Sequence, residues 1–255
     1  MRNLIWFRSD LRIDDNPALR AACDNSAEVH AIFLYSQAQL EKHNEANIKL
    51  DFLIENLKCL SDHLKEMNIS FSILNSKGFD EDPKIILKTA VDKNVDKVFF
   101  NKQFGEDEQK RDIEVISFLN SSNIRNESFN DQIVYEAGSI RTGQDNPYSV
   151  FTPFKRKWIE NFDMEFLDIE HKYTPMAQGD ISSNILSFNF DFKIEHKVDM
   201  SIWPSGEQAA LKRLRHFLEN KASNYSKDRN DPIIDGTSRM SPYLALGVIS
   251  VSYTH

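Results

Sequence analysis

Hydrophobic residues in the first half of the chain follow two alternating patterns. Short runs of β-branched and aromatic residues, typical of buried strands, alternate with longer segments whose apolar residues recur every three or four positions, as in amphipathic helices. Strands are predicted at residues 4–7, 29–35, 69–74 and 97–101. This alternation over residues 1–130 predicts an α/β domain with a doubly wound, five-stranded parallel sheet and helices on both faces.

Helices are predicted after each of these strands. The first begins at Asn16, which can cap a helix, with Pro17 at the first helical position. The third covers residues 83–91 and the fourth residues 107–119. The second is a single long helix, predicted from apolar residues that fall near one face: Ile48, Phe52, Leu57, Leu60, Leu64 and Met67.

The regular pattern stops near residue 130. Between residues 131 and 204, Gly, Pro, Asn and Ser are spread through short periodic segments, which predicts an interdomain linker wrapped on the first domain. A helical pattern returns over residues 205–255, with one helix from Glu207 and another near Ser241, which predicts the truncated start of a helical domain. The linker is expected to be anchored by aromatic residues: Tyr148, Phe151, Phe154 and Trp158.

Composition excludes several classes of protein. Hydrophobic residues at 40% and charged residues at 27% are ordinary for a globular protein. No stretch approaches the roughly 20 apolar residues that span a bilayer, and the N-terminus lacks a signal-peptide pattern. We therefore expect a cytoplasmic protein. The two cysteines, Cys23 and Cys59, form no CxxC pair and have no His at ligand spacing, which argues against a zinc site.

The net charge of −8 argues against DNA binding over the whole surface, because Lys and Arg supply most of such affinity. Charge is unevenly distributed, however. Residues 208–239 carry seven basic side chains against four acidic ones. This segment is either a local DNA-binding surface or a solvated helix face.

No GxGxxG motif follows the first strand, so the dinucleotide-binding fingerprint is missing. Ligands of open parallel sheets bind beyond the carboxyl ends of the strands. That rule points to the loops after Phe7, Tyr35 and Asn101. These loops hold four candidate polar residues: Arg8, His43, Asp107 and Glu108.

A hydroxyl-rich turn precedes the last predicted helix. We expect Ser241 to be the N-cap of this helix and Pro242 its first residue. Backbone N–H groups, hydroxyls and the guanidinium of Arg239 can together bind an anion such as a pyrophosphate. The alternative is a simple helix cap beside a surface arginine.

Three strings, in this order, carry a resemblance to a known family. They are LIWFRSDLR at residues 4–12 with DNPAL at 15–19, PYSVFTPFK at 147–155, and YSKDR at 225–229 followed by GTSRMS at 236–241. Together they resemble the photolyase/cryptochrome family, and within it the bacterial class I photolyases that repair cyclobutane pyrimidine dimers. A chance match to all three strings is improbable, because they occur in the family's order over nearly the whole chain.

The resemblance implies a carbon–carbon lyase that repairs pyrimidine dimers in DNA with blue or near-UV light, by electron transfer from reduced FAD. It implies DNA contact by Arg229, whose alternative role is an ion pair with Asp228 or Asp231. Met240 stands where a Leu is common, a change that conserves volume. FAD is expected to contact six residues: Tyr225, Thr237, Ser238, Arg239, Met240 and Ser241.

The resemblance also implies an antenna chromophore in the first domain, expected to be 5,10-methenyltetrahydrofolate. The matching positions are His43, Asp107 and Glu108. Asp107 replaces an Asn of the family pattern, and a carboxylate only accepts hydrogen bonds. The charged residues Arg8, Asp10 and Arg12 are expected to tie the linker or the second domain to the sheet rather than to act in catalysis.

Two alternatives stay open at this point. A cryptochrome would share these motifs as a light receptor without repair, and a free-standing α/β ligand-binding module would have no photochemistry. We expect a monomer, and we expect residues 1–255 alone to be inactive, because the family's flavin pocket and dimer-binding residues belong to the region after residue 255.

Overall fold

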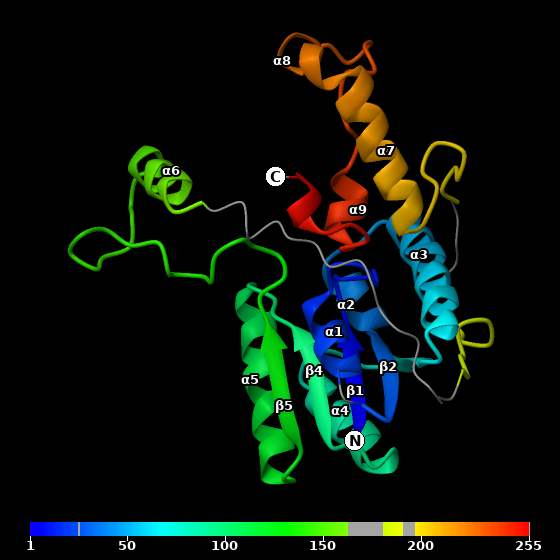
Figure 1. The fold of residues 1–255 in the computed structure, drawn as a ribbon. Coiled ribbons are helices and arrows are strands. Elements are labelled where there is room, and N and C mark those ends of the chain that lie inside the picture. Colours follow the sequence, from blue (N-terminus) through cyan, green and yellow to red (C-terminus); the bar gives the residue numbers. More distant parts are fainter. Residues whose placement is uncertain (25, 163–180, 191–196, 255) are drawn as a thin grey trace.

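The computed structural model describes residues 1–24, 26–162, 181–190 and 197–254. Its centre is a sheet of five strands in the order β3-β2-β1-β4-β5, with every neighbouring pair parallel. Figure 1 shows this sheet below the C-terminal helices. The predicted doubly wound parallel sheet is confirmed. The strands are β1 (Arg2–Phe7), β2 (Glu28–Tyr35), β3 (Ser70–Asn75), β4 (Lys97–Asn101) and β5 (Arg125–Phe129).

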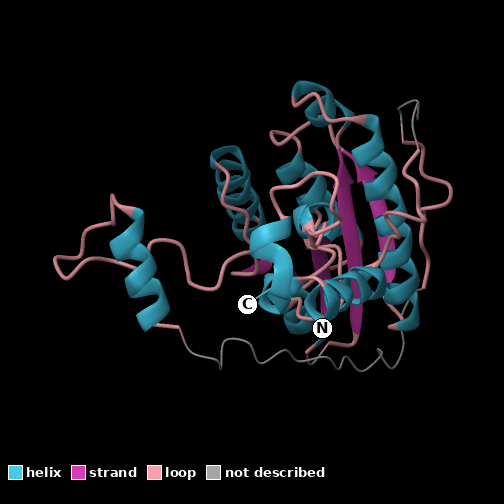
Figure 2. Cartoon of the chain, turned by 90° about the horizontal axis from the view of Figure 1, so that it is seen from above, coloured by secondary structure: helices cyan, strands magenta, loops and turns pink. Residues whose placement is uncertain are grey.

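Helices cover both faces of the sheet and enclose two separate cores (Figure 2). Side chains of β1 alternate between them: Ile5 and Phe7 join the core under α1 and α3, whereas Leu4 and Trp6 join the core under α4 and α5. The five helices are α1 (Pro17–Cys23), α2 (Gln37–Lys42), α3 (Asn47–Glu66), α4 (Asp82–Asp92) and α5 (Glu106–Ser121).

The predicted long helix is confirmed as α3, which begins one residue before Ile48. A separate short helix, α2, precedes it, capped by the Ser36 side chain, which accepts a hydrogen bond from the Gln39 N–H. Ile48 was placed on the buried face but is 46% exposed, because the buried stripe of α3 starts at Leu50. The fifth strand had no predicted position, since β5 reads Arg-Asn-Glu-Ser-Phe and has no fully buried residue.

The linker contacts the sheet in only part of its length. Its residues 182–184 lie along the edge strand β3, where Phe71 N–H donates to the carbonyl of Ser182. The Asn184 side chain bonds both backbone groups of Ile73, at 2.7 and 2.8 Å, and so caps the open edge. This part of the linker therefore wraps on the first domain as expected.

Helix α6 (Phe151–Glu160) stands apart from the sheet and has no buried residue (Figure 2). The aromatic anchors were expected to hold this region on the first domain, and here the expectation is wrong. Phe151 is 72% exposed. The other three contact aromatic rings within residues 131–162, with centroids 6.1 Å apart for Tyr148 and Phe154 and 5.2 Å apart for Trp158 and Phe162.

The C-terminal part is helical and packs on the α/β domain. It contains α7 (Glu207–Asn220), the 3₁₀ turns η2 (Ala222–Asn224) and η3 (Val251–Thr254), α8 (Tyr225–Asp228) and α9 (Ser241–Ala245). Leu211, Tyr243 and Val248 join the core under α1 and α3. Figure 1 shows α7 and α9 beyond the carboxyl ends of the strands. Among the described residues, no helix is both long and apolar enough to cross a membrane.

The start of α9 differs from the prediction by one residue. Met240, not Ser241, is the N-cap, and no side chain caps the helix. Met240 is 3% exposed. Ser241 is the first helical residue and Pro242 the second.

Candidate functional site

A crevice of about 260 Å³ opens at the carboxyl edge of the sheet. It lies beside β1, the strand that pairs with β2 on one side and with β4 on the other. Chain order reverses around β1, and ligands of open α/β sheets bind at such a point. Residues that follow β1, β2, β3 and β4 contribute to the lining, together with α5 and the end of α9.

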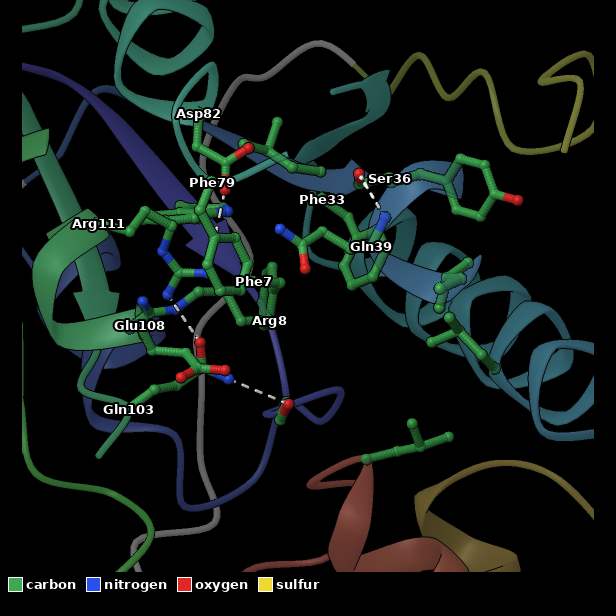
Figure 3. Close-up of a pocket in the computed structure, with 17 residues that line it drawn as sticks. Phe7, Arg8, Phe33, Ser36, Gln39, Phe79, Asp82, Gln103, Glu108 and Arg111 are labelled. Carbon is green, nitrogen blue, oxygen red and sulfur yellow. Dashed lines mark hydrogen bonds and ion pairs between the residues drawn. The ribbon is translucent and has the colours of Figure 1, made fainter. Parts of the chain in front are cut away.

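Aromatic rings and two arginines form the wall of the crevice (Figure 3). The guanidinium carbon of Arg8 lies 4.5 Å from the ring centroid of Trp6. The guanidinium carbon of Arg111 lies 4.7 Å from the same ring and 4.7 Å from the ring of Phe79. Both arginines are buried, with exposed fractions of 8% and 6%. Other aromatic lining residues are Phe7, Phe33 and Tyr35.

Asp112 holds the two arginines in place. Arg8 Nη1 donates to both carboxylate oxygens of Asp112, at 2.7 and 2.9 Å. Arg111 Nε and Nη2 donate to Asp112 Oδ1 at 3.1 and 2.9 Å. One carboxylate thus accepts hydrogen bonds from two guanidinium groups. Burial of a guanidinium without an anionic partner has a high free-energy cost.

Asp82 is the second carboxyl group beside this cluster. Its Oδ2 lies 4.0 Å from Arg111 Nη1, and its Oδ1 accepts a hydrogen bond from the Ser76 hydroxyl at 2.5 Å. Burial raises the pKa of Asp82, against the opposing effect of the Ser76 hydrogen bond. Burial therefore disfavours the ionised form of Asp82 beside the two arginines.

Three buried polar atoms of the crevice have no hydrogen-bond partner within the described part of the chain. They are Trp6 Nε1, Arg8 Nη2 and the amide oxygen of Gln39. An unpaired buried polar group costs about 1–3 kcal/mol, so such groups usually have a partner. Two donors and one acceptor beside several aromatic rings fit a flat, heteroaromatic ligand with both hydrogen-bonding functions.

The end of α9 closes one side of the crevice. Leu246 lines it, and the Leu246 carbonyl accepts a hydrogen bond from Leu11 N–H at 3.1 Å. Gly247 has a φ of 60°, and a side-chain carbon there would lie only 2.1 Å from the carbonyl oxygen of Ser9. Only glycine fits this close approach, which fixes the lining residue Ser9.

The loop after β1 also ties distant parts of the chain together. Arg12 pairs with Asp131 of the linker and donates to the carbonyl of Gly247 at 3.2 Å. Asp10 accepts from the Asn101 amide at 2.7 Å. The tying role expected of these charged residues is confirmed for Arg12, whereas Arg8 pairs with Asp112 of its own domain.

The hydroxyl-rich turn before α9 lies in the C-terminal part. Arg239 has a φ of 54° and pairs with Asp235 at 2.9 Å. Asp235 also accepts a hydrogen bond from Lys221 Nζ at 2.5 Å, and this bond lowers its pKa. Asp235 thus supplies an anionic partner to both cations.

Comparison with known proteins identifies the family. The family model described as DNA photolyase matches residues 3–176. The chain belongs to the DNA photolyase family. It is 32% identical over 250 residues to the deoxyribodipyrimidine photo-lyase of Escherichia coli (strain K12), covering 97% of this chain and 52% of that protein. The chain spans about half the length of the curated relatives it matches.

Solved structures of photolyases and cryptochromes share the fold. An archaeal photolyase from Sulfolobus tokodaii, described with two FAD molecules, has a TM-score of 0.71 at 20% identity and covers all of this chain and 54% of its own. A Synechocystis sp. PCC6803 cryptochrome has a TM-score of 0.74 at 18% identity, over 99% of this chain and 54% of its own. At this identity the likeness concerns the fold alone.

The antenna residues predicted from the photolyase resemblance do not meet in one pocket. Glu108 lines the crevice. His43 is exposed at the C-terminal end of α2, and Asp107 is exposed in the first turn of α5. Glu108 is therefore the one of the three that the crevice contains.

Tyr225 and Arg229 lie together at α8, at the far end of the helical part, whereas Met240 and Ser241 lie at the start of α9, beside the core of the α/β domain (Figure 1). The guanidinium carbon of Arg229 is 5.7 Å from the Tyr225 ring centroid, and Tyr225 packs edge-on against Phe217 at 5.8 Å. Within the described residues, no ion pair joins Arg229 to Asp228 or Asp231, so the alternative role of Arg229 finds no support.

Sequence reasoning missed several residues of the crevice. It considered the loops after β1, β2 and β4 but left out the segment after β3, which supplies Phe79 and Asp82. The strand-end rule applies equally to β3 and would have included that segment. Gln39 and Arg111 lie on helices beyond the loops, where no local motif marks them.

Proposed function

We propose that this chain supplies the α/β domain and the first flavin-binding residues of a deoxyribodipyrimidine photo-lyase. In this proposal, light drives an electron from reduced FAD into a cyclobutane pyrimidine dimer of DNA, and the dimer splits. Membership of the DNA photolyase family and the 32% identity to the E. coli enzyme support it. The cofactor supplies the redox chemistry, whereas the protein binds, orients and excludes water. The dimer is flipped out of the duplex to reach the flavin.

The crevice is proposed to hold the light-harvesting chromophore. The observation that carries this assignment is the set of three unpaired polar atoms in a pocket walled by aromatic rings. Trp6 Nε1 and Arg8 Nη2 can donate to ring carbonyl or ring nitrogen atoms, and the Gln39 oxygen can accept from a ring N–H. A folate such as 5,10-methenyltetrahydrofolate has a pterin ring with both functions, and so does a flavin.

FAD is proposed to bind at Tyr225 and at the turn of Thr237, Ser238, Arg239, Met240 and Ser241. The residues fit an anionic group, because the turn combines three hydroxyls with a guanidinium. A pyrophosphate would replace Asp235 as the partner of Arg239. Met240, which is buried, holds the backbone of the turn rather than offering a polar contact.

Arg229 is proposed to contact a phosphate of DNA. Replacing Arg229 by Ala should weaken binding of damaged and undamaged DNA about equally and reduce the magnitude of the salt slope by about one, since a phosphate contact carries no lesion specificity. Filter binding at several salt concentrations measures both. Unchanged affinity at every salt concentration would show that Arg229 does not contact DNA.

We also propose that the protein is a monomer and that it is located in the cytoplasm.

The decisive experiment uses the natural polypeptide that carries this sequence, purified with its chromophores. We expect near-UV light to remove thymine dimers from an oligonucleotide and expect no loss of dimers in the dark. Retained flavin without light-dependent dimer loss would favour the cryptochrome alternative. Absence of any bound chromophore, at saturating FAD and folate, would favour the free-standing ligand-binding module.

A further inference from the structure

Trp6 is an easily oxidised ring on the wall of a crevice proposed to hold a light-absorbing molecule. It is the penultimate residue of β1 and is 1% exposed. A light-excited ring takes an electron readily from an indole within contact range, and the excitation is then lost. A light-harvesting site beside an unprotected tryptophan would waste the light that it absorbs.

Two cations stack on this tryptophan. The guanidinium carbons of Arg8 and Arg111 lie 4.5 and 4.7 Å from the Trp6 ring centroid. Asp112 contacts the N–H groups of both guanidiniums, Asp82 lies 4.0 Å from Arg111, Asp10 is near Arg8, and Glu108 lines the same crevice. The positive groups are therefore the ones in direct contact with the indole ring. Burial leaves little water to screen them.

We propose that Arg8 and Arg111 protect Trp6 from photo-oxidation and so preserve the excited state of a chromophore bound in the crevice. This inference rests on the light-harvesting role proposed for the crevice. In the suppressed step, one electron leaves the Trp6 indole, which becomes a radical cation, and reduces the light-excited ring. The electron then returns to the indole, which restores Trp6 and the ring to their ground states and releases heat. No proton is transferred, and no covalent bond forms or breaks. The guanidiniums repel the positive charge that the indole would acquire.

Tyr35 is the second oxidisable ring on the crevice wall and has a different protection. Its hydroxyl donates to the amide oxygen of Gln37 at 2.6 Å. Oxidation of a phenol normally requires loss of its proton, and an amide is a poor base for that proton. The aromatic residues Phe7, Phe33 and Phe79 are much harder to oxidise.

The test measures the fluorescence lifetime of a probe bound to residues 1–255. The probes are riboflavin 5′-phosphate and, separately, 5,10-methenyltetrahydrofolate. In the parent chain, excitation of the bound probe should produce no tryptophan radical signal in transient absorption, because Trp6 does not quench the probe. Arg111→Met should shorten the lifetime several-fold and produce a tryptophan radical signal in transient absorption. Arg111→Lys, which keeps the charge, should restore a long lifetime.

Two controls separate charge from structure. Arg141→Met removes an exposed arginine of the linker and should change nothing. Adding Trp6→Phe to Arg111→Met should lengthen the lifetime again, whereas Tyr35→Phe should not. If the parent chain itself shows a tryptophan radical signal after excitation of the bound probe, the proposal is overturned while chromophore binding stands. This measurement decides the matter even if Arg111→Met does not fold. If neither probe binds, the light-harvesting crevice itself is refuted, and this inference with it.

Discussion

At the scale of single residues, Glu207 shows how the helical part depends on the loop after β1. Its Oε2 accepts a hydrogen bond from the Ile13 N–H at 3.2 Å, and it is 3% exposed. Burial, and then the nearby Asp14, raise the pKa of Glu207 from 4.5 to about 7. The folded chain therefore binds this proton more tightly than the unfolded chain does.

The contribution of Glu207 to the free energy of unfolding should consequently be largest below pH 4.5 and be lost as the pH rises through 7, a change of roughly 3 kcal/mol. Glu207→Gln is neutral and keeps an acceptor oxygen, so it should remove this dependence and stabilise the chain at pH 8. Urea unfolding at pH 5 and pH 8 measures the difference. Glu219→Gln, on an exposed position of α7, is the matched control. An equal loss of stability with pH in Glu207→Gln would disprove the assignment.

Asp235 is the residue that competes with the proposed pyrophosphate. It pairs with both Lys221 and Arg239 in this structure, and the Lys221 hydrogen bond keeps it ionised by lowering its pKa. Asp235→Asn should release both cations and tighten binding of inorganic pyrophosphate by about two- to fivefold, as expected for exposed ion pairs. Isothermal titration measures this, with Asp231→Asn as control. Weaker binding by Asp235→Asn would mean that Asp235 orders the turn rather than competing for it.

At the scale of elements, the hydrophobic pattern predicts the structure wherever one face of an element is buried. Strand β2 and helix α4 were placed within two residues of their ends, since nearly all of β2 is buried and Ile86 and Ala90 of α4 lie on one face. The polar strand β5 and the short helix α2 were not placed. Strand β5 is ordered by pairing with β4, and α2 is ordered by the cap at Ser36. Neither interaction requires regularly spaced hydrophobic residues, so neither can be recognised from the hydrophobic pattern.

The candidate site was predictable to a smaller extent. Arg8 and Glu108 follow from the rule that ligands bind at strand ends. The contact between Trp6 and Arg111 joins residues about a hundred positions apart, and its two partners belong to different elements. Sequence pattern places each of them on its element, but only the packing of α5 against β1 brings them together.

The close approach of α9 to the loop after β1 predicts a strict requirement for glycine at 247. Gly247→Ala should lower the free energy of unfolding by roughly 2–4 kcal/mol. The alanine would be strained in the left-handed backbone conformation, and its side-chain carbon would clash with the Ser9 carbonyl. Gly143→Ala is the matched control, since no atom lies within 4 Å of its added carbon. Urea midpoints of the two variants measure the contrast. Equal midpoints would show that α9 can move away from Ser9 without cost.

At the scale of the whole molecule, the two proposed chromophore sites differ in completeness. All residues that line the crevice belong to residues 6–246, and they come from six strands or helices as well as from loops. The proposed FAD residues form one turn and one tyrosine, and the side chain of Arg239 is 42% exposed. Ligand pockets normally bury most of the ligand surface. The crevice should therefore bind its ligand within residues 1–255, whereas the flavin turn should not.

This difference predicts how FAD content responds to Arg239→Ala. Residues 1–255 should bind a folate or flavin in the crevice, and Arg239→Ala should leave that binding unchanged, because Arg239 does not line the crevice. In the natural polypeptide, the same change should cause loss of FAD during purification, since the pyrophosphate loses a strong cationic partner. Absorbance of the bound flavin after gel filtration measures both. Stoichiometric FAD on residues 1–255 that disappears with Arg239→Ala would contradict the prediction, because the turn would then hold FAD without the rest of an enclosing pocket.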